Sequence, residues 1–408
     1  MDPVRNPYAP GAGQRPPELA GRDRELAQFD VVLERVARGR PERSLMLTGL
    51  RGVGKTVLLN ALRSAAISRL WGTAKVEARP DQSLRRPLAG ALHLALREVA
   101  PRHRDQEQVD TVLGVLKAFA VRPPAAATAA RSTSARSGMR ERWSPAIDVP
   151  ARSGRADSGD LEVDLVELLV DAGSLARDVG VGLALFVDEM QDVTPHDVSA
   201  VCAACHELSQ QGLPVVVVGA GLPHLPAVLS AAKSYSERLF RYVRIDRLER
   251  AAADLALVSP AAEEGVAFST AALDALYAQT EGYPYFVQAY GKATWDVAPR
   301  SPISAADVRV AVPEATAELA VGFFGSRYER ATPAERDYLR AMATLSAPSA
   351  AEAAVSTAEV AAHLQRKPSS LSPARDSLLK KGLIFSAERG TIAFTVPHFG
   401  AFLRAQAT

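Results

Sequence analysis

The stretch that decides the fold is Gly49-Leu50-Arg51-Gly52-Val53-Gly54-Lys55-Thr56, which matches the pattern G-x-x-x-x-G-K-[ST] in full. Its glycines permit backbone angles that turn successive N–H groups towards one point, where they can hold an anion. The residues before it, Ser44–Thr48, form a short apolar run typical of a buried strand, and those after it have the spacing of an amphipathic helix. A strand, a glycine-rich loop and a helix N-terminus in this order predict a site for phosphate groups.

Two side chains of this stretch have expected roles of their own. The Lys55 ammonium is expected to reach the β- and γ-phosphates of a nucleotide, and the Thr56 hydroxyl to bind magnesium. The helix that begins near Lys55 directs its positive dipole end at the phosphates. Together with Val57, the stretch Gly49–Thr56 is therefore predicted to bind ATP and Mg²⁺. A chance match is the alternative, but the strand before the loop and the helix after it favour the functional interpretation.

A second motif lies much further along the chain, where the apolar run Leu183–Val187 ends in Asp188 and Glu189. An aspartate at the end of a buried strand can hold magnesium through water, and the glutamate after it can polarise an attacking water as a general base. Acidic residues are also common in solvated turns after strands, which is the alternative. With the phosphate-binding stretch upstream, we expect Asp188 and Glu189 to act with Lys55 in catalysis.

Composition places the chain among ordinary globular proteins. It has 408 residues, of which 47% are hydrophobic and 23% charged, and its formal net charge is +2. This length suits two or three domains, and the small net charge means that any nucleic-acid surface is local. The opening residues lack the apolar core of a signal peptide, and the longest apolar runs are shorter than the roughly 20 residues of a membrane helix. Only two cysteines occur, Cys202 and Cys205, so we expect a cytoplasmic protein without disulfides or membrane segments.

The order of the expected elements divides the chain into four parts. Residues 1–20 are rich in proline and glycine and are expected to form an extended arm. Residues 21–248 alternate strands with helices, which predicts an α/β fold whose parallel sheet is covered by helices on both faces. Within them, the composition of residues 121–160 predicts a flexible insertion. Residues 249–328 are alanine-rich and helical, and residues 329–408 predict three helices and two short strands, typical of a winged helix-turn-helix.

The two motifs together resemble those of the AAA+ and STAND branches of P-loop ATPases. The likeness is greatest to AAA-type ATP-binding proteins that join a P-loop core to a C-terminal winged helix, and archaeal ATPases and replication-origin initiators are similar in layout. It covers most of residues 16–408, except the insertion. The resemblance implies ATP hydrolysis, with residues 249–328 as a lid that approaches the nucleotide.

Further residues are singled out only by this resemblance. Arg22 lies in Leu19–Glu25, which is similar to the family's motif before the first core helix, a helix that lies against the adenine. Pro284 lies in Gly282-Tyr283-Pro284, which is similar to the GxP element of STAND lids, although simple packing inside the lid is the alternative. Arg238 stands where related ATPases carry an arginine finger, which stabilises charge on the γ-phosphate, often across a subunit boundary. A surface ion pair is the alternative role of Arg238.

One position departs from the family pattern. Related ATPases usually have a polar sensor side chain at the end of the strand that follows the strand of the acidic pair. Here that strand, Val215–Val218, is followed by Gly219-Ala220-Gly221, and His224 is the nearest polar candidate. We therefore expect firm ATP binding and slow hydrolysis.

The expected third helix of the winged helix-turn-helix carries several basic side chains. Residues 331–408 contain nine Lys and Arg against six Asp and Glu, a net charge of +3. This charge permits contacts with DNA phosphates. Winged helices also serve as protein-docking modules, so fold alone does not decide the partner. The basic residues are Arg366, Lys367, Arg375, Lys380 and Lys381.

Three functions remain open on the sequence alone. In the first, a slow ATPase acts as a nucleotide-dependent switch that couples ATP and Mg²⁺ binding to contact between the winged helix and DNA or a protein partner. The second is an oligomeric AAA+ nucleic-acid remodeller or initiator, which requires Arg238 or a similar residue of one subunit at the site of its neighbour. The third is an ATP-binding scaffold with little hydrolysis.

Overall fold

A five-stranded sheet forms the centre of the N-terminal half of the molecule. The computed structural model describes residues 1–11, 13–121, 147–346, 354–386, 388 and 390–406. All strand pairs of this sheet are parallel, and the strand order is β2-β3-β4-β1-β5. The strands are β1 (Ser44–Thr48), β2 (Gly72–Glu77), β3 (Leu183–Asp188), β4 (Val215–Gly221) and β5 (Phe240–Arg244).

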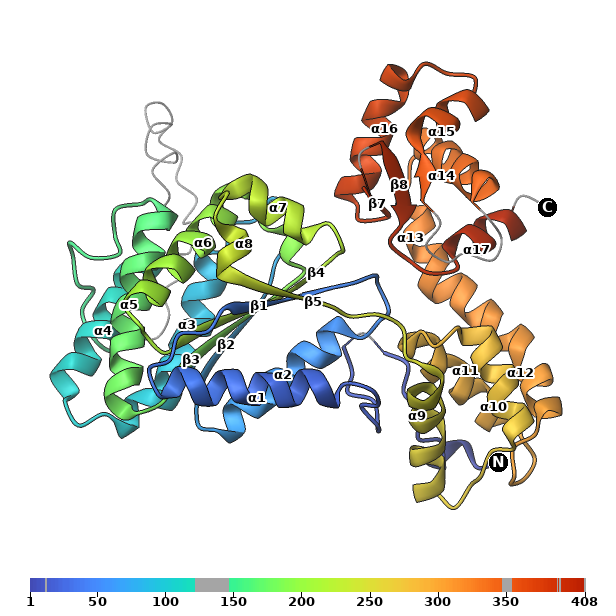
Figure 1. Ribbon diagram of the computed structural model, residues 1–408, viewed down its shortest axis with the longest axis horizontal. Helices are drawn as coiled ribbons and strands as arrows, with labels where there is room; N and C mark the ends of the chain where they lie inside the picture. Colours follow the sequence, from blue (N-terminus) through green and yellow to red (C-terminus); the bar gives the residue numbers. More distant parts are fainter. Residues whose placement is uncertain (12, 122–146, 347–353, 387, 389, 407–408) are drawn as a thin grey trace, which may run out of the picture.

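Helices cover both faces of the sheet, which confirms the predicted α/β fold (Figure 1). The side chains of each strand alternate between two hydrophobic clusters, because successive residues of a strand point to opposite faces. In β1, Leu45 and Leu47 belong to the cluster of α1 (Asp23–Ala37) and α2 (Lys55–Ser68), whereas Met46 belongs to the cluster on the other face. That second cluster is built with α3 (Arg85–Val99), α4 (Gln106–Val121), α5 (Leu161–Val179) and α6 (Pro195–Gln210).

The described part of the predicted insertion is bound to the core. Residues 122–146 of the segment 121–160 lie outside the described residues, so the prediction is not tested there. In the remainder, Lys117 Nζ of α4 donates hydrogen bonds to the carbonyl oxygens of Ile147 and Val149, at 2.9 and 2.8 Å. The buried carboxylate of Asp164 also accepts bonds from the backbone N–H of residues 158 and 159. Residues 147–160 are therefore fixed against α4 and α5 rather than freely extended.

A helical unit follows the sheet and continues into a short stretch of π-helix. The π-helix, η5 (Leu319–Gly325), leads directly into α13 (Ser326–Glu329), so one continuous helical path leaves the unit. Stretches of this kind frequently occur at functional sites. The helices of the unit are α9 (Arg250–Glu263), α10 (Thr270–Thr280), α11 (Pro284–Val297) and α12 (Ala305–Glu318).

The N-terminal arm packs along the helical unit instead of standing free. It contains one turn of 3-10 helix, η1 (Pro3–Arg5). The buried Tyr8 hydroxyl donates a 2.6 Å hydrogen bond to the Leu257 carbonyl oxygen of α9, and Trp295 Nε1 of α11 donates to Asp2 at 3.0 Å. The arm is thus largely extended, as expected, but its first eight residues are held against the helical unit.

The C-terminal unit has the element order helix, strand, helix, helix, strand, strand, followed by one more helix (Figure 1). Its three strands form an antiparallel sheet in the order β6-β8-β7. This order is compatible with a winged helix-turn-helix, which stays a prediction. The elements are α14 (Pro333–Leu345), β6 (Val355–Ser356), α15 (Thr357–His363), α16 (Pro368–Lys380), β7 (Ile384–Ser386), β8 (Thr391–Phe394) and α17 (Phe399–Ala405).

Two of the five basic residues singled out in this unit are bound to acids. Lys381 Nζ lies 2.6 Å from Glu335 Oε2, and Arg375 lies 2.9 Å from Asp376. A basic side chain that is already paired with a carboxylate interacts less strongly with a phosphate backbone.

Among the described residues, no helix combines the length and the apolar composition that a membrane-spanning segment needs.

Candidate nucleotide-binding site

A cavity of about 520 Å³ lies at the carboxyl edge of the sheet, where β1 and β3 end. Four parts of the chain line it: the N-terminal arm, the loop after β1, the end of β3 and the helical unit with its π-helix. Clefts at the carboxyl ends of parallel strands are the usual ligand sites of open α/β sheets. The cavity is therefore the candidate functional site.

The loop between β1 and α2 has the backbone expected of an anion nest. Gly52 and Gly54 adopt left-handed conformations, with φ of 84° and 89°, which other residues reach only with strain. A Cβ at Gly49 would overlap the carbonyl oxygen of Ile245, so this position needs glycine for a different reason, close packing. Lys55 and Thr56 then open α2, whose N-terminus faces the cavity.

Not every residue of the predicted loop faces the cavity. Its lining includes residues 51–57 but neither Gly49 nor Leu50. The Gly49 N–H donates to the Gly221 carbonyl oxygen at 3.2 Å, so it is taken up by the sheet. The carbonyl oxygens of Gly49 and Leu50 accept hydrogen bonds from Lys55 Nζ at 3.0 and 2.7 Å. These two residues position Lys55, and the structure does not place them against a ligand.

Burial gives Lys55 an unusual electrostatic setting. It lowers the pKa of the ammonium to about 8, although the carboxylates of Glu189 and Asp188 act in the opposite direction. An ammonium held close to neutrality by desolvation gains most from a neighbouring anion. A polyphosphate in the cavity would therefore stabilise the charged form of Lys55.

The acidic pair lies at the end of β3 and lines the same cavity as the loop. Asp188 is buried, and its Oδ1 accepts a 2.9 Å hydrogen bond from the Glu189 backbone N–H. Glu189 has φ of 50°, and its Oε1 lies 2.9 Å from Arg51 Nη1 in an ion pair. Its Oε2 accepts a 2.6 Å bond from Gln191 Nε2. Burial raises the pKa of Glu189, but Arg51, Gln191 and Lys55 outweigh it, so the pKa lies below its ordinary value.

The residues present fit a magnesium ion shared with phosphates. Thr56 offers a hydroxyl and Asp188 a carboxylate, and both residues line the cavity. No cluster of three or more His, Cys, Asp or Glu among the described residues could hold a metal without further ligands. Magnesium usually binds through one or two protein oxygens, waters and substrate phosphates. Thr56 and Asp188 would hold it in that way.

The comparison with families agrees with this geometry. The model of the AAA ATPase domain matches residues 18–218, which contain the loop, the acidic pair, the strands β1, β2 and β3, and the first part of β4. The chain carries an AAA ATPase domain. A family described as a domain of unknown function matches residues 321–403, which include most of the π-helix and nearly all of the C-terminal unit.

One solved structure shares the fold beyond the residues of the AAA ATPase domain, and two others are similar at lower TM-scores. The Walker-type ATPase of Pyrococcus abyssi is 15% identical, with a TM-score of 0.58 over 96% of this chain and 97% of that one. The RuvB Holliday junction branch migration motor of Thermotoga maritima is 16% identical, with a TM-score of 0.45 over 94% and 96%. Cdc6p of Pyrobaculum aerophilum is 14% identical, with a TM-score of 0.43 over 100% and 99%. No curated protein matches the sequence.

Two residues predicted from the resemblance do line the cavity of the AAA ATPase domain. Arg22 Nη2 donates hydrogen bonds to the carbonyl oxygens of Val53 and Asp246, at 3.2 and 2.6 Å. It thereby fixes the phosphate-binding loop to the segment that leads into the helical unit. Pro284 is the first residue of α11. The backbone N–H of the next residue, Tyr285, donates to the Gly52 carbonyl oxygen at 3.3 Å, so α11 begins directly on the loop.

Close packing requires glycine near the end of β4. β4 continues through Gly219 and Gly221, three residues further than predicted, and a Cβ at Gly219 would lie 2.5 Å from Met46 Sδ. Gln191 supplies the polar side chain at this edge instead: its Oε1 accepts from the Leu222 N–H at 3.1 Å. His224, the candidate named from sequence, is absent from the lining of the cavity.

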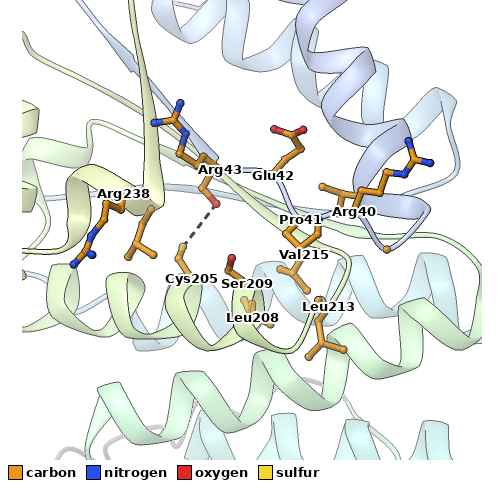
Figure 2. A pocket seen from close by; sticks show the side chains of 15 residues that line it. Arg40, Pro41, Glu42, Arg43, Cys205, Leu208, Ser209, Leu213, Val215 and Arg238 are labelled. Atoms are coloured by element: carbon orange, nitrogen blue, oxygen red, sulfur yellow. Dashed lines mark hydrogen bonds between the residues drawn. The ribbon is translucent and has the colours of Figure 1, made fainter.

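Arg238 lies away from the cavity of its own chain. It precedes β5, whose first residue, Phe240, pairs with Ser44, the first residue of β1, so it stands at the amino edge of the sheet. The phosphate-binding loop follows the opposite, carboxyl edge. Figure 2 shows Arg238 at a separate pocket, which Arg43 and Cys205 also line. An arginine finger acting within one chain is therefore wrong, and only a role at a neighbouring subunit stays a prediction.

The structure also brings to the cavity residues that the sequence did not single out. Arg327 follows the π-helix and donates a hydrogen bond to the Phe323 carbonyl oxygen, with its guanidinium over the Phe323 ring. Burial lowers the pKa of Arg327, and the neighbouring Arg51 lowers it further. Arg327 thus adds a positive charge to the lining of the cavity, which favours an anion there. Arg327 could be assigned to the cavity only from the structure, in which it follows the π-helix, because no sequence motif marks this position.

Proposed function

We propose that the protein is a slow ATPase that acts as a nucleotide-dependent switch. ATP and Mg²⁺ bind in the cavity of the AAA ATPase domain, and their binding changes the contacts that the C-terminal unit offers to DNA or to a protein partner. The observation that carries this proposal is that the loop touches all the units of the chain. Tyr285 of the helical unit bonds Gly52, and the Arg51 N–H donates to the Thr395 carbonyl oxygen of the C-terminal unit at 2.9 Å.

A change at the loop has a direct path to the C-terminal unit in this arrangement. A triphosphate would occupy the space next to Lys55 and Arg327, two cations that line one cavity. Arg327 belongs to the helical path that leads into the C-terminal unit. A ligand shifts a conformational equilibrium only if it binds the two states differently. Cations on separate units provide that difference, because their distances to the phosphates change when the units move.

The test is ATP binding and turnover by the purified full-length protein. Lys55→Ala is expected to weaken ATP binding by at least about tenfold, since it removes the buried cation of the loop. Lys292→Ala serves as the control, because this lysine of α11 pairs with Asp296 and does not line the cavity. Equal ATP affinity of Lys55→Ala and the unaltered protein would overturn the proposal.

The choice between partners follows from the same assay. Turnover is measured with and without duplex DNA at low and physiological salt, because phosphate contacts weaken steeply with salt. Stimulation assigns the C-terminal unit to DNA, and indifference assigns it to a protein partner. Arg366 and Lys367 are exposed just before α16 and are the residues to neutralise if DNA stimulates turnover.

An oligomeric motor is the second candidate, and the exposure of Arg238 favours it. Arg238 is exposed, and no ion pair with a described carboxylate restrains it. The surface ion pair considered as its alternative role is therefore not formed within the described residues. Mass measurement with and without ATP distinguishes the two functions. A monomer under both conditions excludes the motor, whereas an ATP-dependent oligomer whose turnover falls in Arg238→Ala supports it.

A further inference from the structure

Arg51 is the point at which the C-terminal unit meets the acidic pair. Its backbone N–H donates to the Thr395 carbonyl oxygen, and its Nη1 lies 2.9 Å from Glu189 Oε1. A Cβ added to Gly382 would lie 2.9 Å from Arg51 Nη2, so the guanidinium also rests against the backbone of the C-terminal unit. Thr395 Oγ1 donates to the Gly382 carbonyl oxygen at 2.6 Å, which joins the two contact points to each other.

The other oxygen of Glu189 is held as well. Gln191 Nε2 donates to Glu189 Oε2, and Gln191 itself is fixed because its Oε1 accepts from the Leu222 N–H. Each carboxylate oxygen of Glu189 therefore has a donor within hydrogen-bond distance. One donor is the long side chain of Arg51, and the other is Gln191, which is itself bonded to the backbone directly after β4. Charge-assisted hydrogen bonds of this kind are directional as well as strong.

We infer that Arg51 is a positioning residue through which the docked C-terminal unit restrains Glu189. This inference rests on the proposed function and names the regulation of the same site. With the unit docked, the guanidinium is confined between Gly382 and Glu189 and keeps the carboxylate in the ion pair. When the C-terminal unit is released, the guanidinium of Arg51 loses its contact with Gly382 and can move away from Glu189. The Glu189 carboxylate is then free to turn towards an attacking water.

The inference differs from a role of Arg51 as a phosphate ligand. A phosphate ligand lost by mutation weakens ATP binding, whereas a restraint lost by mutation raises turnover and leaves binding in place. The comparison uses Arg51→Gln, which removes the charge, and Arg51→Lys, which keeps it. Arg309→Gln, at an exposed arginine of α12, is the control for loss of one positive charge.

Steady-state turnover of the full-length protein gives the first readout. Arg51→Gln is expected to raise kcat on the order of tenfold, the effect of breaking one charge-assisted bond before reaction. The KM for ATP is expected to change by less than about threefold, because Arg51 is not the main cation of the loop. Arg51→Lys should restore most of the restraint, and Arg309→Gln should match the unaltered protein. A kcat that falls in Arg51→Gln, or a lost affinity for ATP, overturns the inference.

A second variant tests the route through the C-terminal unit. His398 lies at the contact with the helical unit, with ring centroids 5.9 Å from Tyr283 and 5.2 Å from Phe286. Its φ of 60° is a conformation that asparagine tolerates, so His398→Asn removes the ring without straining the backbone. His398→Asn should raise turnover in the unaltered protein but add nothing to Arg51→Gln. Additive effects in the double variant would show that the two sites act independently, and would overturn the route.

Hydrogen exchange without nucleotide separates this inference from the proposed function. Because coupling is reciprocal, breaking the pair at Glu189 should loosen the docked unit. Amides of residues 382–396 should exchange faster in Arg51→Gln and Glu189→Gln than in Arg51→Lys and Arg309→Gln. Unchanged exchange in all four variants overturns the inference even if ATP binding proves the proposed function right. Faster exchange in a protein that does not bind ATP would sustain the restraint and overturn the switch.

Discussion

At the scale of single residues, the phosphate-binding loop is the part of the site that the sequence predicts most fully. Lys55, Thr56, Asp188 and Glu189 line one cavity, as the two motifs indicate. The ion pair of Arg51 with Glu189 could not be foreseen, because the second position after the first glycine of the loop accepts any residue type. The motif fixes the backbone, whereas the neighbour that a variable side chain finds depends on the tertiary structure.

The role of Glu189 as general base is tested by a conservative change. Glu189→Gln keeps the shape of the side chain but cannot accept a proton, so kcat is expected to fall about 100-fold or more. ATP affinity should stay close to that of the unaltered protein, because the carboxylate does not hold the phosphates. Glu237→Gln, at an exposed acid of the short helix α8 (Ser236–Leu239), is the control and should hydrolyse ATP normally. Steady turnover in Glu189→Gln would assign the base to another group.

Asp192 predicts how stability depends on pH. Burial, followed by the charge of Glu189, raises its pKa from 3.8 to about 6. Between these values the folded protein keeps a proton that the unfolded chain releases, so this carboxyl stabilises the fold less as the pH rises through about 6. Asp192→Asn, which is always neutral, should therefore be more stable than the unaltered protein at pH 8. Urea unfolding midpoints that also differ equally at pH 4 would contradict this assignment.

At the scale of elements, the sequence predicts the buried strands well and β5, one of the two edge strands, poorly. β1 and β3 are fully buried and read as apolar runs. β5 contains two arginines among its five residues and is partly exposed at the edge of the sheet, so its signal is weak. The π-helix has no signature of its own, because its sequence differs little from that of an α-helix. A strand that is buried on both faces is recognised in the sequence by its continuous apolar run, whereas a partly exposed strand lacks such a run.

A buried ion pair joins α3 to α5. Arg85 Nη2 lies 2.6 Å from Asp164 Oδ2, and the guanidinium stacks over Phe119 of α4. Asp164→Ala would leave Arg85 buried without its partner and is expected to destabilise the protein by about 3–5 kcal/mol. The control is Asp171→Ala, which breaks the more exposed pair with Arg155 and should cost about 1 kcal/mol or less. Chemical denaturation measures both, and equal losses would show that the buried pair has no special role.

At the scale of the whole molecule, the sequence predicts which units are present but not how they touch. The arm, the helical unit and the C-terminal elements follow from composition and periodicity. Their convergence on one loop depends on single contacts, such as Thr395 with Arg51, that no local pattern encodes. Arg238 is a second example. Its position in the sequence suggested contact with the nucleotide, but in the fold it lies at the amino edge of the sheet, opposite the edge that carries the phosphate-binding loop. Contacts between units are set by packing, which sequence periodicity does not report.

The central claim, that nucleotide at the loop moves the C-terminal unit, is tested by a distance. Both native cysteines are buried, and burial raises the pKa of each thiol to about 12, so labels can be directed to Leu94→Cys on α3 and Ala362→Cys on α15, both exposed positions. The distance between spin labels is then measured with and without saturating ATP and Mg²⁺. We predict a shifted distance distribution that is absent in the Lys55→Ala background. An unchanged distribution in a protein shown to bind ATP would contradict the account.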